Sequence, residues 1–193
     1  MALAFTPLHQ FRLLEEMKNS VESLLEDDHA SLDQLLIELD AELTKPEVTR
    51  AFELLDLFWA RLAVHIRAEN VHLFPALANA PASLFIGEGS LPGFEEAHSL
   101  LLRLRSDHDF FMKELAQLVK LMREIVASKQ ARIKEVKDIR QRMTIIKKRL
   151  EGHNRLEEEQ AYVWPALLFD EPMVSRLQDR IRLELENLPP RFS

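Results

Sequence analysis

The chain has 193 residues, which suits one domain that is long enough to bury a hydrophobic core without added cross-links. It contains no cysteine, which excludes disulfides and thiolate metal sites. The formal charge of −7, with Lys and Arg scattered along the chain, argues against a nucleic-acid partner. Four glycines and abundant Leu, Glu, Lys and Arg predict a helical protein.

The expected helices, in chain order, are separated by stretches rich in Pro, Gly and Ser. Four long amphipathic segments occupy roughly residues 10–44, 47–78, 94–127 and 131–168, and a short helix follows near 172–187. A long loop is predicted at 80–93, so the chain divides into two helical hairpins. We expect a single domain over residues 1–193, with an N-terminal extension before the bundle.

No segment of the sequence has the pattern of a membrane span or a signal peptide. Residues 71–87 carry no formal charge, but His72, Pro75 and Pro81 interrupt them. The start of the chain has no basic region and too short an apolar run. We therefore expect a cytoplasmic protein that does not contact membranes.

A short pattern occurs twice in the chain, once in the second helix of each hairpin. "RLAVHIRAE" occupies residues 61–69 and "RLEGHNRLE" occupies 149–157, so both copies contain His-x-x-x-Glu. The first helix of each hairpin contains Asp-His, in "DDHASLDQLL" at 27–36 and in "SDHDFFMKEL" at 106–115. The two hairpins therefore carry matched polar groups.

Helix geometry predicts that these groups meet. His and Glu four residues apart lie on one helix face. Counted from the turns at a rise of about 1.5 Å per residue, the histidines of each antiparallel pair lie at nearly one height. An up-down-up-down four-helix bundle would place four imidazoles and two carboxylates in one buried layer. These side chains are His29, His65, Glu69, His108, His153 and Glu157.

A buried polar layer of this kind is costly unless its groups have partners. Two divalent metals would provide them, and a set of imidazole and carboxylate donors suits Fe, Mn or Zn. Two carboxylates from facing helices are placed to bridge a metal pair, and four histidines supply two per metal. An open position would remain, as in catalytic and small-molecule sites.

The doubled pattern, with "LFP" at 73–75 after its first copy, resembles the hemerythrin-like, HHE cation-binding proteins over roughly residues 25–168. The resemblance implies an all-α bundle around two iron ions, bridged by two carboxylates and an oxo or hydroxo group. It carries the ligand role to the six residues named above. Oxygen-carrying hemerythrins have a further histidine where this chain has Met112, and they space the carboxylate of the fourth helix differently. We therefore expect both metals to be reachable by exogenous ligands, without reversible oxygen carriage.

Other polar side chains near the expected layer are assigned by helical spacing. His72 and Gln160 each lie seven residues after the ligand histidine of their helix. They are expected either as a polar outer ring or proton path below the metals, or as polar contacts at the end of the bundle. Met112, four residues after a ligand histidine, is expected to pack rather than to bind metal. Asp33 holds the matching place on the first helix and is expected in a surface ion pair, with orientation of a ligand imidazole as the alternative.

The aromatic residues and arginines near the layer are assigned in the same way. Tyr162 and Phe74 each lie nine residues after a ligand histidine, on the opposite helix face, so both are expected to pack away from the metals. Trp164 returns to the ligand face and is expected to plug the bundle beneath the site. Arg61 and Arg149 are expected in ion pairs on the helix surface, with support of the carboxylates as the alternative.

Together with these residues, the resemblance implies a di-iron protein that binds or senses a small oxidant or diatomic molecule, such as oxygen, nitric oxide or peroxide. The alternatives are a di-iron enzyme (peroxidase-like, nitric-oxide-reducing or repairing iron centres) and iron or zinc handling without redox chemistry. A ferritin-like site built from Glu-x-x-His pairs, here Glu26/His29 and Glu95/His98, is a rival, but it leaves three of the other histidines without a role. Self-association into a homo-oligomer stays open.

Overall fold

The computed structural model describes residues 20–193, apart from 88, 90, 129–132, 191 and 193. The chain is all-helical, as predicted, and no strand forms among the described residues. An isolated bridge pairs Ile86 with Gly93 in the loop that joins the two hairpins. No helix in the described part of the chain is long and apolar enough to cross a membrane. The beginning of the first predicted segment lies outside the described residues.

The first hairpin consists of α2 (Val21–Glu42) and α3 (Thr49–Ala68). The side chain of Ser20 caps α2 by accepting a hydrogen bond from the backbone N–H of Ser23. After α3 the chain passes through a π-helix, η1 (Glu69–Leu73), into α4 (Phe74–Ala78). A short 3₁₀ turn, η2 (Ala82–Leu84), lies in the loop that follows.

The second hairpin repeats this order. The helices are α5 (Phe94–Ser128) and α6 (Ile133–Leu156), and α6 is followed by the π-helix η3 (Glu157–Ala161) and by α7 (Trp164–Leu168). The last helix, α8 (Glu171–Leu185), corresponds to the short helix expected near 172–187. The π-helices therefore begin at the same place in both hairpins, at the glutamate of each His-x-x-x-Glu.

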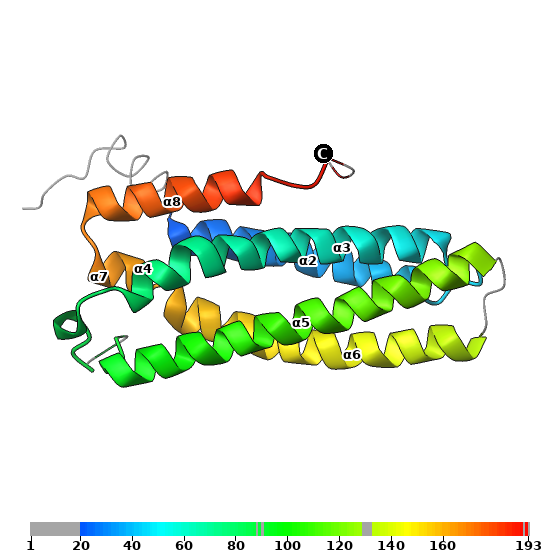
Figure 1. Ribbon diagram of the computed structural model, residues 1–193, viewed down its shortest axis with the longest axis horizontal. Coiled ribbons are helices and arrows are strands. Elements are labelled where there is room, and N and C mark those ends of the chain that lie inside the picture. The colour runs from blue at the N-terminus through cyan, green and yellow to red at the C-terminus, as the bar shows by residue number, and fades with distance from the viewer. Residues whose placement is uncertain (1–19, 88, 90, 129–132, 191, 193) are drawn as a thin grey trace, which may run out of the picture.

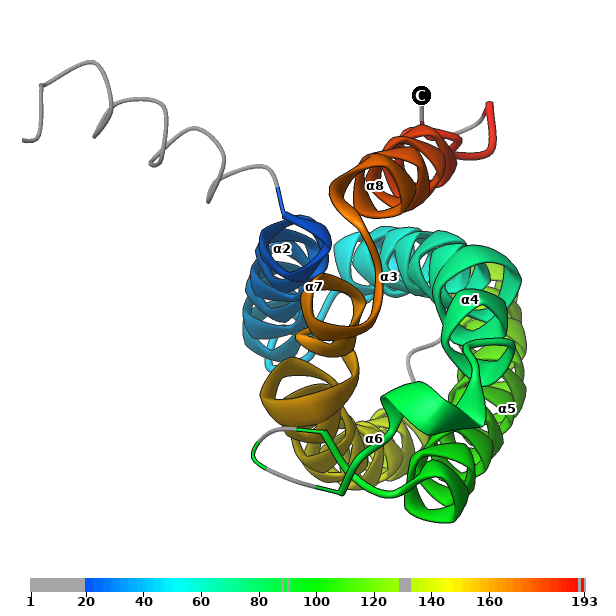
Figure 2. The same cartoon turned by 90° about the vertical axis from the view of Figure 1, so that its left-hand side faces the viewer.

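Helices α2, α3, α5 and α6 lie side by side along the long axis of the molecule (Figure 1). Viewed along that axis, they form a ring, and α8 lies outside it against α2 and α3 (Figure 2). The expected helical bundle is thus confirmed, with α8 added to one of its faces.

The apolar core is divided in two by a polar layer. One cluster of buried residues includes Leu32 and Phe111 and extends toward the turn between α2 and α3. The other includes Leu25 and Leu104 and extends toward α4 and α7. On α2 the two clusters meet at residue 29, and on α5 they meet at residue 108, which are histidine positions in both helices. The apolar periodicity of each helix is thus interrupted at one level of the bundle.

Candidate metal centre

Six histidine and glutamate side chains lie together in this layer. They come from α2, α3, η1, α5, α6 and η3, and none is more than 3% exposed. They are the six expected from the sequence: His29, His65, Glu69, His108, His153 and Glu157.

The six side chains form two groups. The first consists of His29, His65, Glu69 and Glu157, whose potential ligand atoms all lie within 4.8 Å of one another. His29 Nε2 lies 3.6 Å from Glu157 Oε2, and His65 Nε2 lies 3.5 Å from Glu69 Oε1. The two imidazole rings are 4.6 Å apart between centroids. Four donors of the kinds that bind iron, manganese or zinc thus converge on one point.

The second group consists of His108, His153 and Glu157. His153 Nε2 lies 3.0 Å from His108 Nε2 and 3.1 Å from Glu157 Oε1. Glu69 reaches this group as well, since its Oε2 lies 3.2 Å from His108 Nε2. Both hairpins therefore contribute to both groups.

The two glutamates extend across both groups, with one oxygen toward each. Glu69 presents Oε1 to His65 and Oε2 to His108, while Glu157 presents Oε2 to His29 and Oε1 to His153. Neither Glu69 Oε2 nor Glu157 Oε1 accepts a hydrogen bond from any residue in the described part of the chain. A buried carboxylate oxygen without a partner is costly. The arrangement fits metal cations, which would satisfy both oxygens.

Burial and neighbouring charges shift the pKa values of the cluster in opposite directions. Burial raises the pKa of Glu157 to about 8, and the charge of Glu69 acts in the same direction. Burial also acts to raise the pKa of Glu69, but His65 and His108 outweigh it and hold that pKa well below its usual range. Burial lowers the pKa of His65, yet Glu69 and Asp28 outweigh burial and raise it to about 10. The metal-free cluster therefore retains protons that bound cations would displace.

A repeated aspartate lies beside one imidazole of each hairpin. In the first hairpin, Asp28 Oδ2 lies 2.9 Å from His65 Nδ1, and Asp28 Oδ1 accepts a hydrogen bond from Arg61 Nη2 at 2.7 Å. Burial would raise the pKa of Asp28, but His65 and Arg61 outweigh it and lower that pKa. The carboxylate therefore stays charged and orients the ring, as carboxylates commonly do behind a metal-bound histidine.

The second hairpin places the same residue types together more loosely, and His153 Nδ1 forms no hydrogen bond with any described residue. Asp107 Oδ2 lies 3.5 Å from His153 Nδ1, and Asp107 Oδ1 accepts a hydrogen bond from Arg149 Nη2 at 2.6 Å. Arg61 and Arg149, expected in ion pairs on the helix surface, therefore hold the aspartates that contact the imidazoles. The alternative, support of the metal carboxylates, is not what the structure shows. The sequence repeats Asp-His and Arg because each hairpin builds this contact once.

The other two imidazoles have different partners in the two hairpins. His29 Nδ1 lies 2.7 Å from Glu158 Oε1, whereas His108 Nδ1 lies 3.3 Å from Asn70 Oδ1. Glu158 and Asn70 each follow the glutamate of their His-x-x-x-Glu, so a carboxylate in one hairpin is replaced by an amide in the other. Burial lowers the pKa values of His29 and His153 and favours their neutral, metal-binding form.

Tyr162 lies within the cluster, and the expectation that it points away is wrong. Its Oη donates a hydrogen bond to Glu69 Oε1 at 2.6 Å and lies 3.1 Å from His29 Nε2. The cause is η3, because a π-turn inserts one extra residue into the helix. Each residue of an α-helix turns by about 100°, so the extra residue rotates the following side chains back toward the ligand face.

The π-helix η1 has the same effect in the first hairpin. Phe74, also expected to point away from the metals, stacks on the His108 ring at 5.5 Å between centroids. The sequence contains a signal that helical spacing overlooks, since Pro75 and Pro165 follow the two π-helices. Proline has no N–H to donate to the preceding turn, which favours an interruption of the α-helix at this place.

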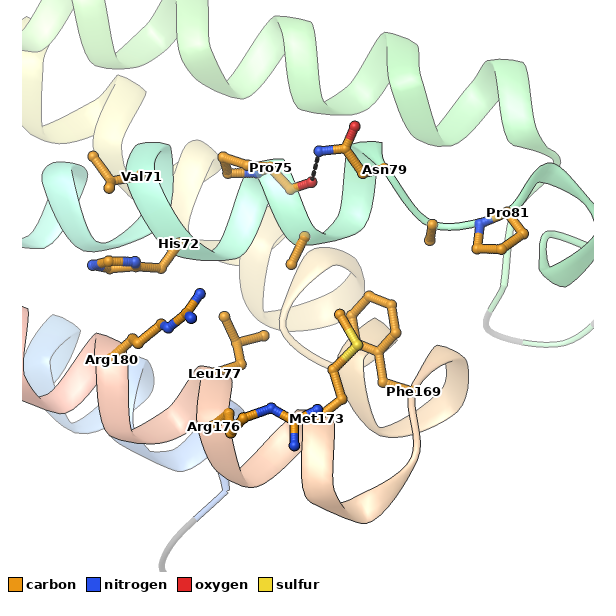
Figure 3. Close-up of a pocket in the computed structure, with 12 residues that line it drawn as sticks. Val71, His72, Pro75, Asn79, Pro81, Phe169, Met173, Arg176, Leu177 and Arg180 are labelled. Carbon is orange, nitrogen blue, oxygen red and sulfur yellow. Dashed lines mark hydrogen bonds between the residues drawn. The ribbon is translucent and has the colours of Figure 1, made fainter.

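His72 lies outside the cluster, because η1 also turns it away from His65. Its Nε2 lies 3.3 Å from Glu184 Oε2 on α8, so it does not form the expected proton path below the metals. Figure 3 shows His72 on η1 facing α8 near Arg180, at one end of a surface groove of about 440 Å³. None of the six cluster residues lines this groove. Of the two expectations, a polar contact describes His72, although its partner belongs to α8.

The remaining candidates lie around the layer without entering it. Met112 is partly buried and packs against the apolar cluster of Leu32 and Phe111, as expected. Gln160 is half-buried in η3, and Asp33 is exposed. Trp164 is fully buried and packs edge-on against Phe85, at the α7 end of the core. The ferritin-like alternative is wrong for His98, whose ring nitrogens contact the backbone oxygens of residues 94 and 78.

Comparison with protein families gives a match that includes the whole cluster. A family model described as the hemerythrin HHE cation binding domain matches residues 20–165, which include all six clustered side chains. Comparisons with curated proteins and with solved structures gave no match. The match extends over most of the chain and confirms the resemblance seen in the doubled motif. With its buried His and Glu residues contributed equally by both hairpins, the chain belongs to the hemerythrin HHE cation-binding domain family.

Proposed function

We propose that this protein holds two iron ions in the layer between its two apolar clusters and uses them to bind or sense a small oxidant or diatomic molecule. The observation that carries the proposal is the pair of buried carboxylate oxygens without hydrogen-bond partners, Glu69 Oε2 and Glu157 Oε1. We infer that the four long helices run alternately up and down, as the equal depths of the histidines require. The ligand set would be His29, His65 and Glu69 from one hairpin, with His108, His153 and Glu157 from the other.

The protein's own side chains define what such a site accepts. Bound iron would supply a redox couple and a position for a small ligand. Phe74 stacks on His108, and Phe111 packs edge-on against His153 at 5.2 Å, so apolar rings contact both imidazoles of the second group. Since no cluster side chain is more than 3% exposed, only a small ligand would reach metals held there. Oxygen, nitric oxide and peroxide are of this size.

Met112 supports sensing or chemistry rather than oxygen transport. Oxygen-carrying relatives supply one of the two metals with the nitrogen of an additional histidine. Met112 packs in the apolar core at the position where oxygen-carrying relatives have a further histidine. This side chain therefore supplies no additional nitrogen to the metal held by His108 and His153.

The protein produced with iron should contain two irons per chain by elemental analysis. After reduction without oxygen and mixing with air, we expect its absorption spectrum to pass to a stable oxidised form that evacuation does not reverse. Met112→His should shift this behaviour toward reversibility. A stable content of one iron would contradict the paired site, and full recovery of the reduced spectrum under vacuum would identify an oxygen carrier.

Asp28→Asn should weaken metal binding about 10- to 100-fold, the usual effect of losing the carboxylate behind a metal-bound histidine. Asp28 both orients the His65 ring and holds Arg61, and the amide would remove the charge while keeping the shape. Competition with a coloured chelator measures the dissociation constant for zinc or ferrous iron. The exposed neighbour Asp27 offers a matched control, Asp27→Asn, which should bind as the wild type does. Equal weakening in both variants would assign the effect to net charge alone.

A further inference from the structure

Tyr162 is the buried group of the metal layer that the six-ligand set leaves unused. It is 1% exposed, and its Oη lies close to donor atoms of the first group. The distances are 2.6 Å to Glu69 Oε1, 3.1 Å to His29 Nε2, 3.3 Å to His65 Nε2 and 3.3 Å to Glu157 Oε2. One phenol oxygen therefore lies within hydrogen-bond range of all four donor atoms.

These separations are the ones expected between neighbouring ligands of one metal ion. Nitrogen and oxygen donors lie about 2.1 Å from such a metal, so two donors at a right angle stand about 3 Å apart. Tyr162 Oη has this spacing to four donors at once. A donor at the apex of a square pyramid has the same relation to the four donors of its base. The base would consist of His29 Nε2, His65 Nε2, Glu69 Oε1 and Glu157 Oε2.

The second group has no equivalent phenol. Position 74 corresponds to position 162 in the doubled motif, nine residues after the ligand histidine, and it holds Phe74. Phe74 stacks on His108 with an interplanar angle of 3°, and its ring offers no donor atom. The same π-helical interruption thus brings a tyrosine to one group and a phenylalanine to the other.

Resting on the proposed function, we propose that Tyr162 Oη is a seventh protein ligand that fills the metal position of His29 and His65. The phenol proton is released to solvent as the metal binds, and an oxygen lone pair forms the new bond. The metal held by His108 and His153 is then the one that accepts an exogenous ligand. This assignment replaces the expectation that both metals are reachable by exogenous ligands.

The surface of the protein supports this difference between the two positions. A pocket of about 450 Å³ lies beside the second group and is lined by Asp107, His153 and the cationic side chains of Arg103, Lys148 and Arg149. His153 thus borders a surface pocket, whereas His29 and His65 face the phenol. The positive charge around the pocket favours an anionic ligand such as azide.

The ferric protein should show the visible absorption and the phenolate vibrations in resonance Raman spectra that mark a tyrosine bound to iron(III). Tyr162→Phe should lose both signals while keeping two irons per chain, since it retains the ring that packs in the core. Phe74→Tyr is the matched reverse variant and leaves the wild-type tyrosine signal in place. Two bound irons without phenolate signals in the wild type would overturn this proposal alone. A wild-type protein that binds no iron would overturn it together with the proposed function.

Azide titration of the ferric protein provides a second measurement. We expect the wild type to bind one azide per chain, and Tyr162→Phe to bind two because the apical position becomes free. The number bound is read from the change in visible absorption against added azide. Two azides per wild-type chain, or no gain in the variant, would show that Tyr162 does not fill a ligand position.

Discussion

Chelation of the metals should lower the melting temperature of the protein by about 10 °C or more. A ligand that binds only the folded state, present at about a thousand times its dissociation constant, stabilises that state by about 4 kcal/mol. For a chain of this size, each kcal/mol shifts the melting temperature by about 2–4 °C. Removal also leaves Glu69 and Glu157 buried beside each other at 0% exposure. Scanning calorimetry before and after chelation measures the difference, and re-addition of metal is the control.

The difference in free energy of unfolding between the metal-loaded and the metal-free protein should widen as the pH rises from about 7 to about 9. The pKa of His65 is raised from 6.5 to about 10, and that of Glu157 from 4.5 to about 8. Each group therefore stabilises the metal-free fold below its unfolded pKa, and this contribution is lost as the pH rises through the folded pKa. For each proton that only the folded state retains, the free energy of unfolding falls by about 1.4 kcal/mol per pH unit. A gap that stays constant over this range would contradict the assigned pKa shifts.

The six clustered side chains could be predicted from the sequence because regular helices place them. His65 and Glu69 are four residues apart in one helix, and the distance of each histidine from its turn fixes its depth in the bundle. Two copies of the pattern then determine which helices must face one another. These steps use helix geometry alone and no side-chain contacts. The position of Tyr162 and the partners of the imidazoles depend on such contacts, so helix geometry does not predict them.

The errors share one physical cause, which is the assumption of an unbroken α-helix. η1 and η3 begin at Glu69 and Glu157, and every later side chain is rotated relative to the expectation. Tyr162 and Phe74 therefore turn toward the cluster, while His72 turns away from it. The following prolines were visible in the sequence, but they do not reveal whether a helix ends, kinks or inserts a residue.

The contacts of α8 depend on how a separate helix docks, which the sequence pattern does not determine. Glu184 of α8 forms an ion pair with Arg67 and lies 3.3 Å from the His72 ring. Arg67 is 45% exposed and still binds this partner. The amphipathic pattern of residues 172–187 predicts a buried face without naming the helices that cover it.

Glu69→Gln and Glu157→Gln should each impair binding of both metals, because each carboxylate presents one oxygen to each group. His153→Ala should instead remove the second metal and leave the first, since His153 belongs to one group. Metal content after gel filtration, together with the melting temperature, separates these outcomes.

Glu159→Gln is the matched control for the glutamate variants, since Glu159 is exposed two residues after Glu157 and the change removes the same charge. It should keep both metals and the wild-type melting temperature. The two carboxylate variants should lose most of the stabilisation that chelation removes, because an amide in place of either carboxylate cannot supply anionic oxygens to both positions. If either variant retained two tightly bound metals, that glutamate would belong to one metal only, and the assignment of oxygens to the two groups would be wrong.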